Sequence, residues 1–343
     1  MDFTLSDEQL MFAETARGLF TDRCNPDHWR RLMEAGESRD SGLWQAIVET
    51  GFTQILLPED AGGLGLSELD FALVAEAAGY VALPEPLVES AGIAAPLLAA
   101  LAPDHPALSE PTASIAIQQA EGALVADADS AAAIIVRDGD AALVVAAEAA
   151  RLDRRESIDP FRRLFAVEWD RKDAQPLGPA DWALALDRGA LFAAAQGLGL
   201  AQRAVDLAVT YAAERPQFGK PIGSYQAVKH HLSSAQVAIE FARPVVLAAA
   251  AGIAHGDIHS RARISHAKLV ALEAADAAAR TSIQVHGAMG YSWEVDVHLF
   301  LKRALALSGS WGTPGFHRAR IAERLFNQPA GPEFTFARDI ENA

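Results

Sequence analysis

The segment that decides the fold is residues 214–230, with the sequence ERPQFGKPIGSYQAVKH. Ala-rich stretches with apolar residues at helical spacing precede and follow it, so its glycines and prolines predict a turn between two helices. The turn carries more hydrogen-bond donors than a bare connection needs, on Arg215, Gln217, Lys220 and Gln226. The planar donor fork of arginine suits phosphate oxygens. The pattern alone leaves two interpretations open, a turn with solvated polar residues or a turn that binds an anionic ligand.

The pattern Arg-x-Gln-Phe-Gly-x-Pro-Ile that begins at Arg215, followed by Gln226 and Lys229-His230, resembles the signature of the acyl-CoA dehydrogenase family of flavoproteins. The resemblance implies that this turn crosses a subunit interface and that Arg215 holds the pyrophosphate of the neighbouring subunit's FAD. Further landmarks of the family recur in the same order. Residues 57–66 resemble its Pro-Glu-x-x-Gly-Gly-x-Gly loop, and residues 284–291 resemble its Gln-x-x-Gly-Gly-x-Gly-Tyr/Phe loop.

Composition limits the class of protein. The chain has 343 residues, of which 50% are hydrophobic and 22% charged, as is ordinary for a soluble globular protein of two or three domains. We find neither an apolar run long enough to span a membrane nor a signal peptide, and the single cysteine, Cys24, excludes a cysteine-based metal site. We therefore expect a cytoplasmic protein with no membrane partner. The net charge of -16 argues against nucleic-acid binding but allows an anionic ligand where basic residues gather.

Residues 1–108 are predicted to form an N-terminal helical domain. Ser6 and Gln9 have the spacing of a capping box at the start of a helix. A second helix is predicted over residues 43–49, and Ser67 is predicted to begin another after a glycine-rich loop.

Residues 109–178 are predicted to form a reduced β domain. Four β-favouring runs lie over residues 113–117, 133–136, 143–145 and 164–169. Residues 138–140 are a plausible hairpin turn between two of them. Compared with a full family member, the domain lacks a counterpart of one segment that contacts the flavin ring, and residues 109–114 are at most a remnant of the other. The resemblance therefore puts in question whether this chain holds a flavin ring of its own.

Residues 179–343 are predicted to form a C-terminal four-helix bundle, which makes the fold class mainly α with a small β domain, like that of acyl-CoA dehydrogenases. The first helices are expected over residues 186–214, from 228 to about 256, and over 261–285. An apolar stripe of the second helix is typical of a bundle core and consists of Val228, Leu232, Ala235, Ile239, Ala242 and Val246. Gly197 and Gly199 indicate close helix packing rather than a dinucleotide fingerprint, because no strand precedes them.

The resemblance assigns FAD contacts to eight residues, which are Arg215, Gln217, Phe218, Gln226, Gln284, Gly287, Ala288 and Thr313. Ala288 replaces the second glycine of the family loop, and small residues there let a cofactor approach the backbone. In the family, the turn and this loop serve the FAD of the neighbouring subunit.

The residue that would act as the base is missing. In this family a carboxylate removes the α-proton of a CoA thioester while the β-hydride passes to the flavin. Residues 311–313 align with the family's Glu-Gly-Thr, so Trp311 occupies the usual glutamate position and cannot accept a proton. Asp187 is a weak alternative, because some members place the base at the start of this helix. The matching position is nevertheless Gly189–Ala190, and a shift of two residues turns a helix by about 200°. A solvated aspartate at the helix entry is the plainer interpretation.

The resemblance therefore predicts a subunit that lends residues to a neighbour's FAD without a base of its own. Our first hypothesis is a subunit of a heteromeric (α2β2) acyl-CoA dehydrogenase, in which a homologous partner chain supplies the catalytic glutamate. The substrate would be a fatty-acyl or bulky steroid side-chain CoA thioester, and electrons would pass to an electron-transfer acceptor protein. Two alternatives remain open: a self-sufficient homo-oligomeric dehydrogenase with a relocated base, and a non-enzymatic homologue that stabilises or regulates another protein.

Overall fold

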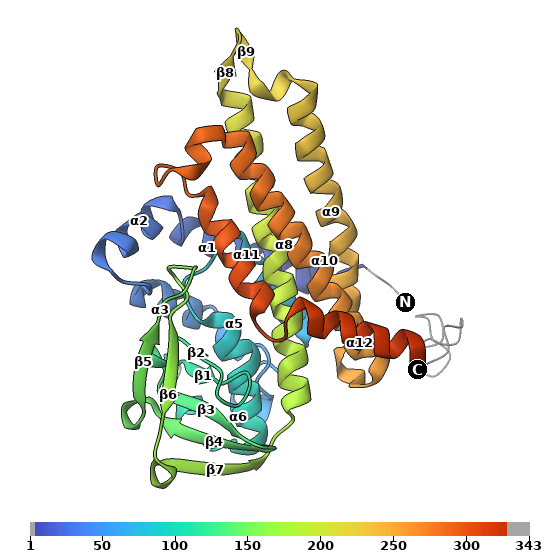
Figure 1. Cartoon of the computed structure of the whole chain (residues 1–343). Coiled ribbons are helices and arrows are strands. Elements are labelled where there is room, and N and C mark those ends of the chain that lie inside the picture. Colours follow the sequence, from blue (N-terminus) through green and yellow to red (C-terminus); the bar gives the residue numbers. More distant parts are fainter. Residues whose placement is uncertain (1–3, 111, 328–343) are drawn as a thin grey trace.

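The computed structural model describes residues 4–110 and 112–327. Helices dominate, and a small β region lies between an N-terminal and a C-terminal helical part, which confirms the expected fold class (Figure 1). The N-terminal helices are α1 (Asp7–Arg23), α2 (Pro26–Ala35), α3 (Ser41–Glu49), α4 (Glu68–Tyr80), α5 (Leu87–Glu89), α6 (Ala95–Leu101) and α7 (Pro106–Ser109), with a π-helical turn at Ser90–Ala94.

Two predicted helix starts are present and contact each other. At α1, the Ser6 hydroxyl accepts a hydrogen bond from the Gln9 N–H at 3.2 Å, and the Gln9 side chain accepts one from the Ser6 N–H at 3.1 Å. At α4, the Ser67 N–H donates to the Asp70 carboxylate at 2.8 Å. The Gln9 amide also donates to Asp70 at 3.0 Å. Because these bonds satisfy N–H groups that a helix start leaves free, they set where both helices begin.

Within residues 112–179, seven strands form two sheets, in the orders β1-β3-β4-β7 and β2-β6-β5. Their bounds are β1 Ile115–Ile117, β2 Val125–Ala126, β3 Ala133–Asp138, β4 Ala141–Ala146, β5 Arg151–Arg155, β6 Leu164–Glu168 and β7 Ala174–Pro179. The predicted hairpin joins β3 to β4 and turns at Gly139, whose φ is 63°. Ile134 and Val136 pack with Phe165 of the second sheet, whereas Ile135 joins the helical core. The alternation of strand side chains thus places the first sheet between the second sheet and the helices.

Three strands of the β region, β2, β5 and β7, were not predicted from the sequence. β2 has two residues, β5 consists mainly of charged residues, and β7 contains Pro176 and Pro179. None of these has the β-branched, alternating pattern on which strand prediction depends. They are strands because β6 pairs with β2 and β5, and because β4 pairs with β7.

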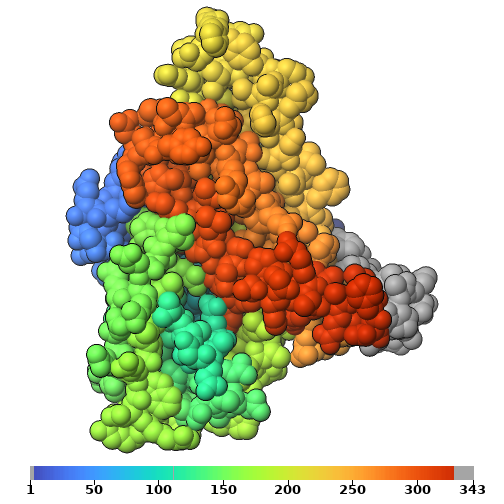
Figure 2. All heavy atoms as spheres, in the orientation of Figure 1, coloured from blue at the N-terminus to red at the C-terminus, as the bar shows by residue number. Residues whose placement is uncertain are grey.

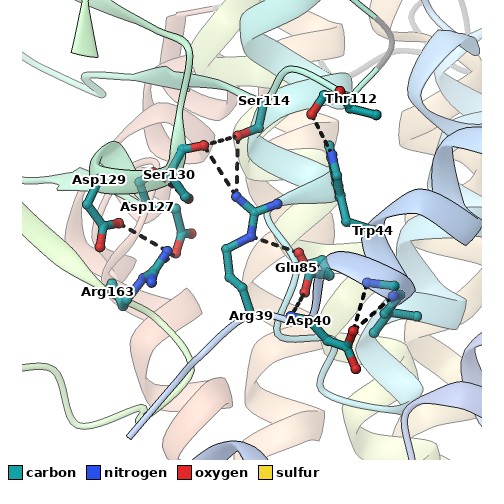
Figure 3. Close-up of polar contacts among 12 residues, drawn as sticks. Arg39, Asp40, Trp44, Glu85, Thr112, Ser114, Asp127, Asp129, Ser130 and Arg163 are labelled. Carbon is teal, nitrogen blue, oxygen red and sulfur yellow. Dashed lines mark hydrogen bonds and ion pairs between the residues drawn. The ribbon is translucent and has the colours of Figure 1, made fainter. Parts of the chain in front are cut away.

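Polar contacts fix the β region on the N-terminal helices (Figure 3). Arg39 Nε donates to the buried Glu85 carboxylate at 2.8 Å, and Arg39 Nη1 lies 3.4 Å from Ser114 Oγ beside β1. Trp44 Nε1 of α3 donates to the Thr112 carbonyl at 2.8 Å. The Arg39–Ser114 and Trp44–Thr112 contacts join the two parts, and the Arg39–Glu85 ion pair within the helical part holds the Arg39 side chain in place.

The C-terminal helices are α8 (Trp182–Glu214), α9 (Gln226–Ala251), α10 (Ile258–His286), α11 (Val297–Gly309) and α12 (Pro314–Asn327). α10 contacts all four of the others. α8 begins four residues earlier than predicted, because Asp181 caps it by accepting from the Leu184 N–H at 2.9 Å. α12 crosses the front of the molecule in Figure 2.

Glycines bring α4 and α8 into backbone contact. A Cβ on Gly199 would lie 2.0 Å from the Glu76 carbonyl oxygen, and a Cβ on Gly79 would lie 2.1 Å from the Gln196 carbonyl oxygen. No larger residue fits at either position without moving a helix. The interpretation of Gly199 as a packing glycine is confirmed.

Helix α9 is more apolar than we expected from the sequence. Together with the short turn after it, over Gln226–His255, it is long and apolar enough to cross a membrane, with a mean hydropathy of 1.7. The expectation that no apolar run reaches this length was therefore wrong. Core helices of soluble proteins pass the same test, and α9 packs against α8 and α10. The predicted stripe is buried from Ala235 to Val246, whereas Val228 and Leu232 are half-buried where α9 projects beyond the bundle (Figure 2).

Candidate functional site

A two-residue hairpin projects from the bundle where α8 passes into α9 (Figure 1). β8 (Pro216–Gln217) pairs with β9 (Lys220–Pro221), and Phe218 and Gly219 form the turn with φ values of 54° and 81°. Two successive positive φ values match the twist of a tight hairpin, but a bulky residue seldom adopts the first of them. Phe218 is also 92% exposed. A strained aromatic side chain in solvent indicates a position that serves contact with another molecule.

The hairpin presents its polar side chains to solvent. Arg215, Gln217 and Gln226 are exposed, and their side chains have no ion pair or hydrogen bond to any residue that the structure describes. The hairpin is held instead by its own contacts, since Tyr225 Oη donates to the Gln217 carbonyl at 3.1 Å and Lys220 Nζ lies 4.3 Å from the Tyr225 ring centroid. The three side chains are therefore available to a ligand.

The loop after α10 lies at the same end of the bundle. The rings of Tyr211 and His286 stack with centroids 4.2 Å apart, which joins the last turn of α8 to that of α10. His286 Nδ1 also lies 2.8 Å from the Ser282 carbonyl oxygen. Both contacts of the ring therefore stabilise the end of the bundle. Gly287 ends α10 with a φ of 60°, and no atom of the described residues lies within 4 Å of the place where a Cβ would lie. The structure thus brings seven predicted FAD contacts to one end of the bundle, namely Arg215, Gln217, Phe218, Gln226, Gln284, Gly287 and Ala288.

Thr313 does not belong to this group. The 13-residue helix α11 separates it from the loop after α10, and it lies at the start of α12. Its hydroxyl lies 3.3 Å from the Phe316 N–H, which donates to it. Thr313 therefore serves as a helix cap beside Trp311.

Trp311 stands where the resemblance predicts the base. The residue is 3% exposed and its backbone has a φ of 52°. Its indole lies directly against Gly189 of α8, so that a Cβ built on Gly189 would be 2.1 Å from Trp311 Cδ2. The Trp311 N–H donates to Gln119 of the β region at 2.8 Å. The two positions that the sequence identified for a base are thus in contact, and neither carries a carboxylate.

Buried basic residues hold the loop that carries Trp311. Lys268 of α10 is 2% exposed and donates to the carbonyl oxygens of Ser310 and, at 2.7 Å, of Gly312. Burial lowers the pKa of Lys268 to about 7. His317 Nε2 of α12 donates to the Trp311 carbonyl at 2.9 Å, and burial lowers the pKa of His317 to about 4, so this ring is neutral at pH 7. The loop is therefore held from two helices at once.

Asp187 is neither solvated nor at the helix entry. It lies in the second turn of α8, and its side chain is 4% exposed. One carboxylate oxygen lies 2.7 Å from Arg320 of α12, and the other lies 3.6 Å from Arg261 of α10. Burial raises the pKa of Asp187, and Arg320 opposes that rise. Arg320 and Arg261 thus both pair with the carboxylate, so the interpretation of Asp187 as a solvated aspartate at the helix entry was wrong.

Sequence reasoning missed Lys268, His317 and Gln119. The one signal for Lys268 was a lysine within the apolar pattern of the predicted helix over residues 261–285. Gln119 reaches Trp311 from a segment far away in the sequence. His317 lies only six residues after Trp311, but no sequence pattern indicates that its ring contacts the Trp311 carbonyl.

Family models match most of the chain. The acyl-CoA dehydrogenase N-terminal domain matches residues 6–104, and the acyl-CoA dehydrogenase C-terminal domain matches residues 180–326. Together they cover the two helical parts on either side of the β region.

Individual proteins agree with this assignment. The chain is 37% identical over 336 residues to the acyl-CoA dehydrogenase IpdE2 of Mycobacterium tuberculosis, covering 95% of this chain and 100% of that protein. Among solved structures, the ChsE4-ChsE5 complex from Mycobacterium tuberculosis matches with a TM-score of 0.82 at 23% identity, covering 96% of this chain and 100% of that one. The Tcur3481-Tcur3483 steroid ACAD matches with a TM-score of 0.80 at 24% identity, covering 94% and 99%.

Proposed function

Because the chain belongs to the acyl-CoA dehydrogenase family of FAD flavoproteins, we propose that it is the subunit of a heteromeric dehydrogenase that completes its partner's FAD site. The partner would be a homologous chain with the catalytic glutamate. This chain would contribute its hairpin and the loop after α10, and no base.

One observation carries the proposal, namely the contact between Trp311 and Gly189. A base must lie within hydrogen-bond reach of the proton that it removes. Here the Trp311 indole occupies one candidate base position and packs against Gly189, the other. Asp187 forms ion pairs with Arg320 and Arg261. The self-sufficient alternative with Asp187 as base would have to break the buried ion pair with Arg320 and the weaker pair with the half-exposed Arg261.

The hairpin and loop residues fit FAD. A pyrophosphate needs charged and amide donors with no competing partner, which is the state of Arg215, Gln217 and Gln226 among the described residues. An adenosine moiety needs close access to the backbone, which the open Gly287 allows. The exposed Phe218 adds apolar surface at the tip. These groups are exposed on their own subunit, as residues lent to a neighbour must be.

In the assembled enzyme, each group of residues would have a separate task. Bound FAD supplies the acceptor for the hydride in the α,β-dehydrogenation of a CoA thioester. Arg215 balances the charge of the pyrophosphate, and Gln217 and Gln226 orient it through their amides. In this chain the buried Trp311 would fill the place of the base and exclude water there, and no residue of the loop would transfer a proton.

The relatives support the substrate class that we propose. One similar structure is described as a complex of two proteins, and another as a steroid ACAD of two chains. These descriptions support an assembly of two different chains acting on a bulky acyl-CoA of the steroid side-chain type, and we propose the stoichiometry α2β2 for it. A non-enzymatic role in stabilising a partner is the alternative, and it predicts no contribution to flavin binding.

The test is the visible absorbance spectrum and native mass of this chain, alone and co-expressed with a homologue that has glutamate at the position of Trp311. We expect a colourless chain alone and a yellow complex that contains both chains. A yellow homo-oligomer of this chain alone, bleached by an acyl-CoA, would overturn the proposal. A two-chain complex whose flavin content is unaffected by Arg215→Ala would favour the non-enzymatic role.

A further inference from the structure

The β region carries a concentration of arginine that the rest of the chain does not share. The whole chain has 29 Lys and Arg residues against 45 Asp and Glu residues, yet residues 151–163 contain five arginines and three carboxylates. This segment forms β5, the edge strand of the second sheet, and the loop that leads into β6.

The segment surrounds a cleft of about 460 Å³, lined by the side chains of Arg154, Arg155, Glu156, Asp159, Arg162 and Arg163, among others. That volume lies within the range of about 300–1,000 Å³ typical of small-molecule sites. Four arginines against two carboxylates make the lining cationic in a strongly acidic protein. Such a local reversal of charge attracts anions.

Several of the charged residues that line the cleft are paired with an oppositely charged residue. Asp159 accepts from the buried Arg303 of α11 and, at 3.0 Å, from the Phe161 N–H, so it does not oppose an anion strongly. Arg163 lies 3.0 Å from Asp129, and Arg155 lies 2.8 Å from Asp153. These pairs leave two arginines, Arg154 and Arg162, with no carboxylate partner among the described residues.

Arg162 is held in place by the protein, whereas Arg154 is exposed, and each state favours the binding of an anion. Arg162 is anchored, because its Nη1 donates to the Ala306 carbonyl at 3.3 Å, while its buried Nε has no partner in the described part of the chain. A buried donor without a partner is unfavourable, and an acceptor from a ligand would remove that cost. Arg154 is exposed and can reach a ligand without losing a contact. Glu156 is the one carboxylate of the lining without a cation partner within the described ranges.

We infer that this cleft binds the phosphate groups of a phosphorylated nucleotide, with Arg154 and Arg162 as its principal cations. Guanidinium groups bind phosphate oxygens in a bidentate manner, and a cleft of this size accepts more than a single phosphate. That the nucleotide belongs to coenzyme A rests on the proposed function, whereas the cationic cleft does not. The site needs no base and no flavin, so it can operate in a subunit that performs no proton transfer.

The test is isothermal titration of the full-length chain with adenosine 3′,5′-bisphosphate, coenzyme A and inorganic phosphate. We expect the bisphosphate and coenzyme A to bind, and inorganic phosphate to bind at least about tenfold more weakly. Arg154→Glu should weaken binding of the bisphosphate by at least about tenfold, and Glu156→Gln should tighten it. The matched control is Arg171→Glu, because Arg171 is 83% exposed, pairs with Asp138 and lies outside the cleft.

Different results of this titration distinguish a nucleotide site from a phosphate site and from no site. No binding of the bisphosphate at millimolar concentration, or equal losses in Arg154→Glu and Arg171→Glu, would overturn the inference and leave the arginines as charges that protect an exposed edge strand. Equal affinity for inorganic phosphate would exclude a nucleotide site. Flavin content of the two-chain complex should not change in Arg154→Glu, so the proposed function can fail or hold independently of this site.

Discussion

The indole of Trp311 lies so close to Gly189 that a Cβ on residue 189 would be 2.1 Å from Cδ2 of the tryptophan. A large side chain at 311 therefore requires glycine at 189, and any side chain at 189 would require a smaller residue at 311. Only one of the two positions can carry a side chain of appreciable size. In this chain position 311 carries an aromatic ring, where the proposed function requires the partner to carry a glutamate.

Gly189→Ala should destabilise the protein, because the new methyl group would overlap a buried indole. Overpacking of this kind costs about 1–3 kcal/mol in free energy of unfolding. Urea denaturation measures it, and Gly18→Ala is the control, since no atom lies within 4 Å of a Cβ at that helical position. The control should be neutral or more stable by up to about 1 kcal/mol. Equal effects of both changes would contradict the close contact.

Trp311→Glu should not create a dehydrogenase in this chain alone. The carboxylate would replace a ring that is 3% exposed, and its position would be held by a loop bonded to Lys268 and His317. We expect a loss of stability of about 3 kcal/mol or more from the lost packing, and no acyl-CoA-dependent bleaching of added FAD. Bleaching by the purified variant alone would show that the chain retains a complete flavin site.

Arg215→Ala should lower the FAD content of the two-chain complex. Loss of a charge-assisted hydrogen bond to a pyrophosphate corresponds to about 1.5–3 kcal/mol, or a roughly tenfold to hundredfold weaker affinity for FAD. Absorbance of the flavin per mole of complex, after dialysis, measures the change. Arg171→Ala removes another exposed arginine and should leave the flavin content unchanged.

Stability should fall in acid partly because of His317. Its pKa is lowered from 6.5 to about 4 by burial, so the unfolded chain binds a proton that the folded chain does not. The sign follows directly: stability due to neutral His317 is complete above pH 6.5 and is lost as the pH falls towards 4, by on the order of 2–3 kcal/mol. Urea denaturation between pH 7 and 4 should show a shallower decline in His317→Gln. An identical pH dependence in the variant would exclude this histidine as a cause, since His298, also lowered to about 4, is present in both.

Local patterns in the sequence determined much of this protein. Ser6 with Gln9, the hairpin at Gly139 and the long amphipathic helices were predictable because capping, turn chemistry and helical periodicity act over a few residues. The family signature at Arg215 was readable for the same reason, since its residues are contiguous. The exposed state of the hairpin and its strained Phe218 were not, because exposure depends on what the rest of the chain covers.

Tertiary structure alone decided the rest. β5, with the sequence Arg-Leu-Asp-Arg-Arg, is a strand only because β6 pairs with it, and its arginines line a cleft only because the 156–163 loop folds beside it. Asp187 is a buried ion-pair partner because α10 and α12 bring Arg261 and Arg320 to it. That residue 311 is a tryptophan and not a glutamate was visible in the sequence, but the packing of its ring on Gly189 was not. Contacts between residues more than a hundred positions apart depend on how helices pack, and no local pattern records that packing.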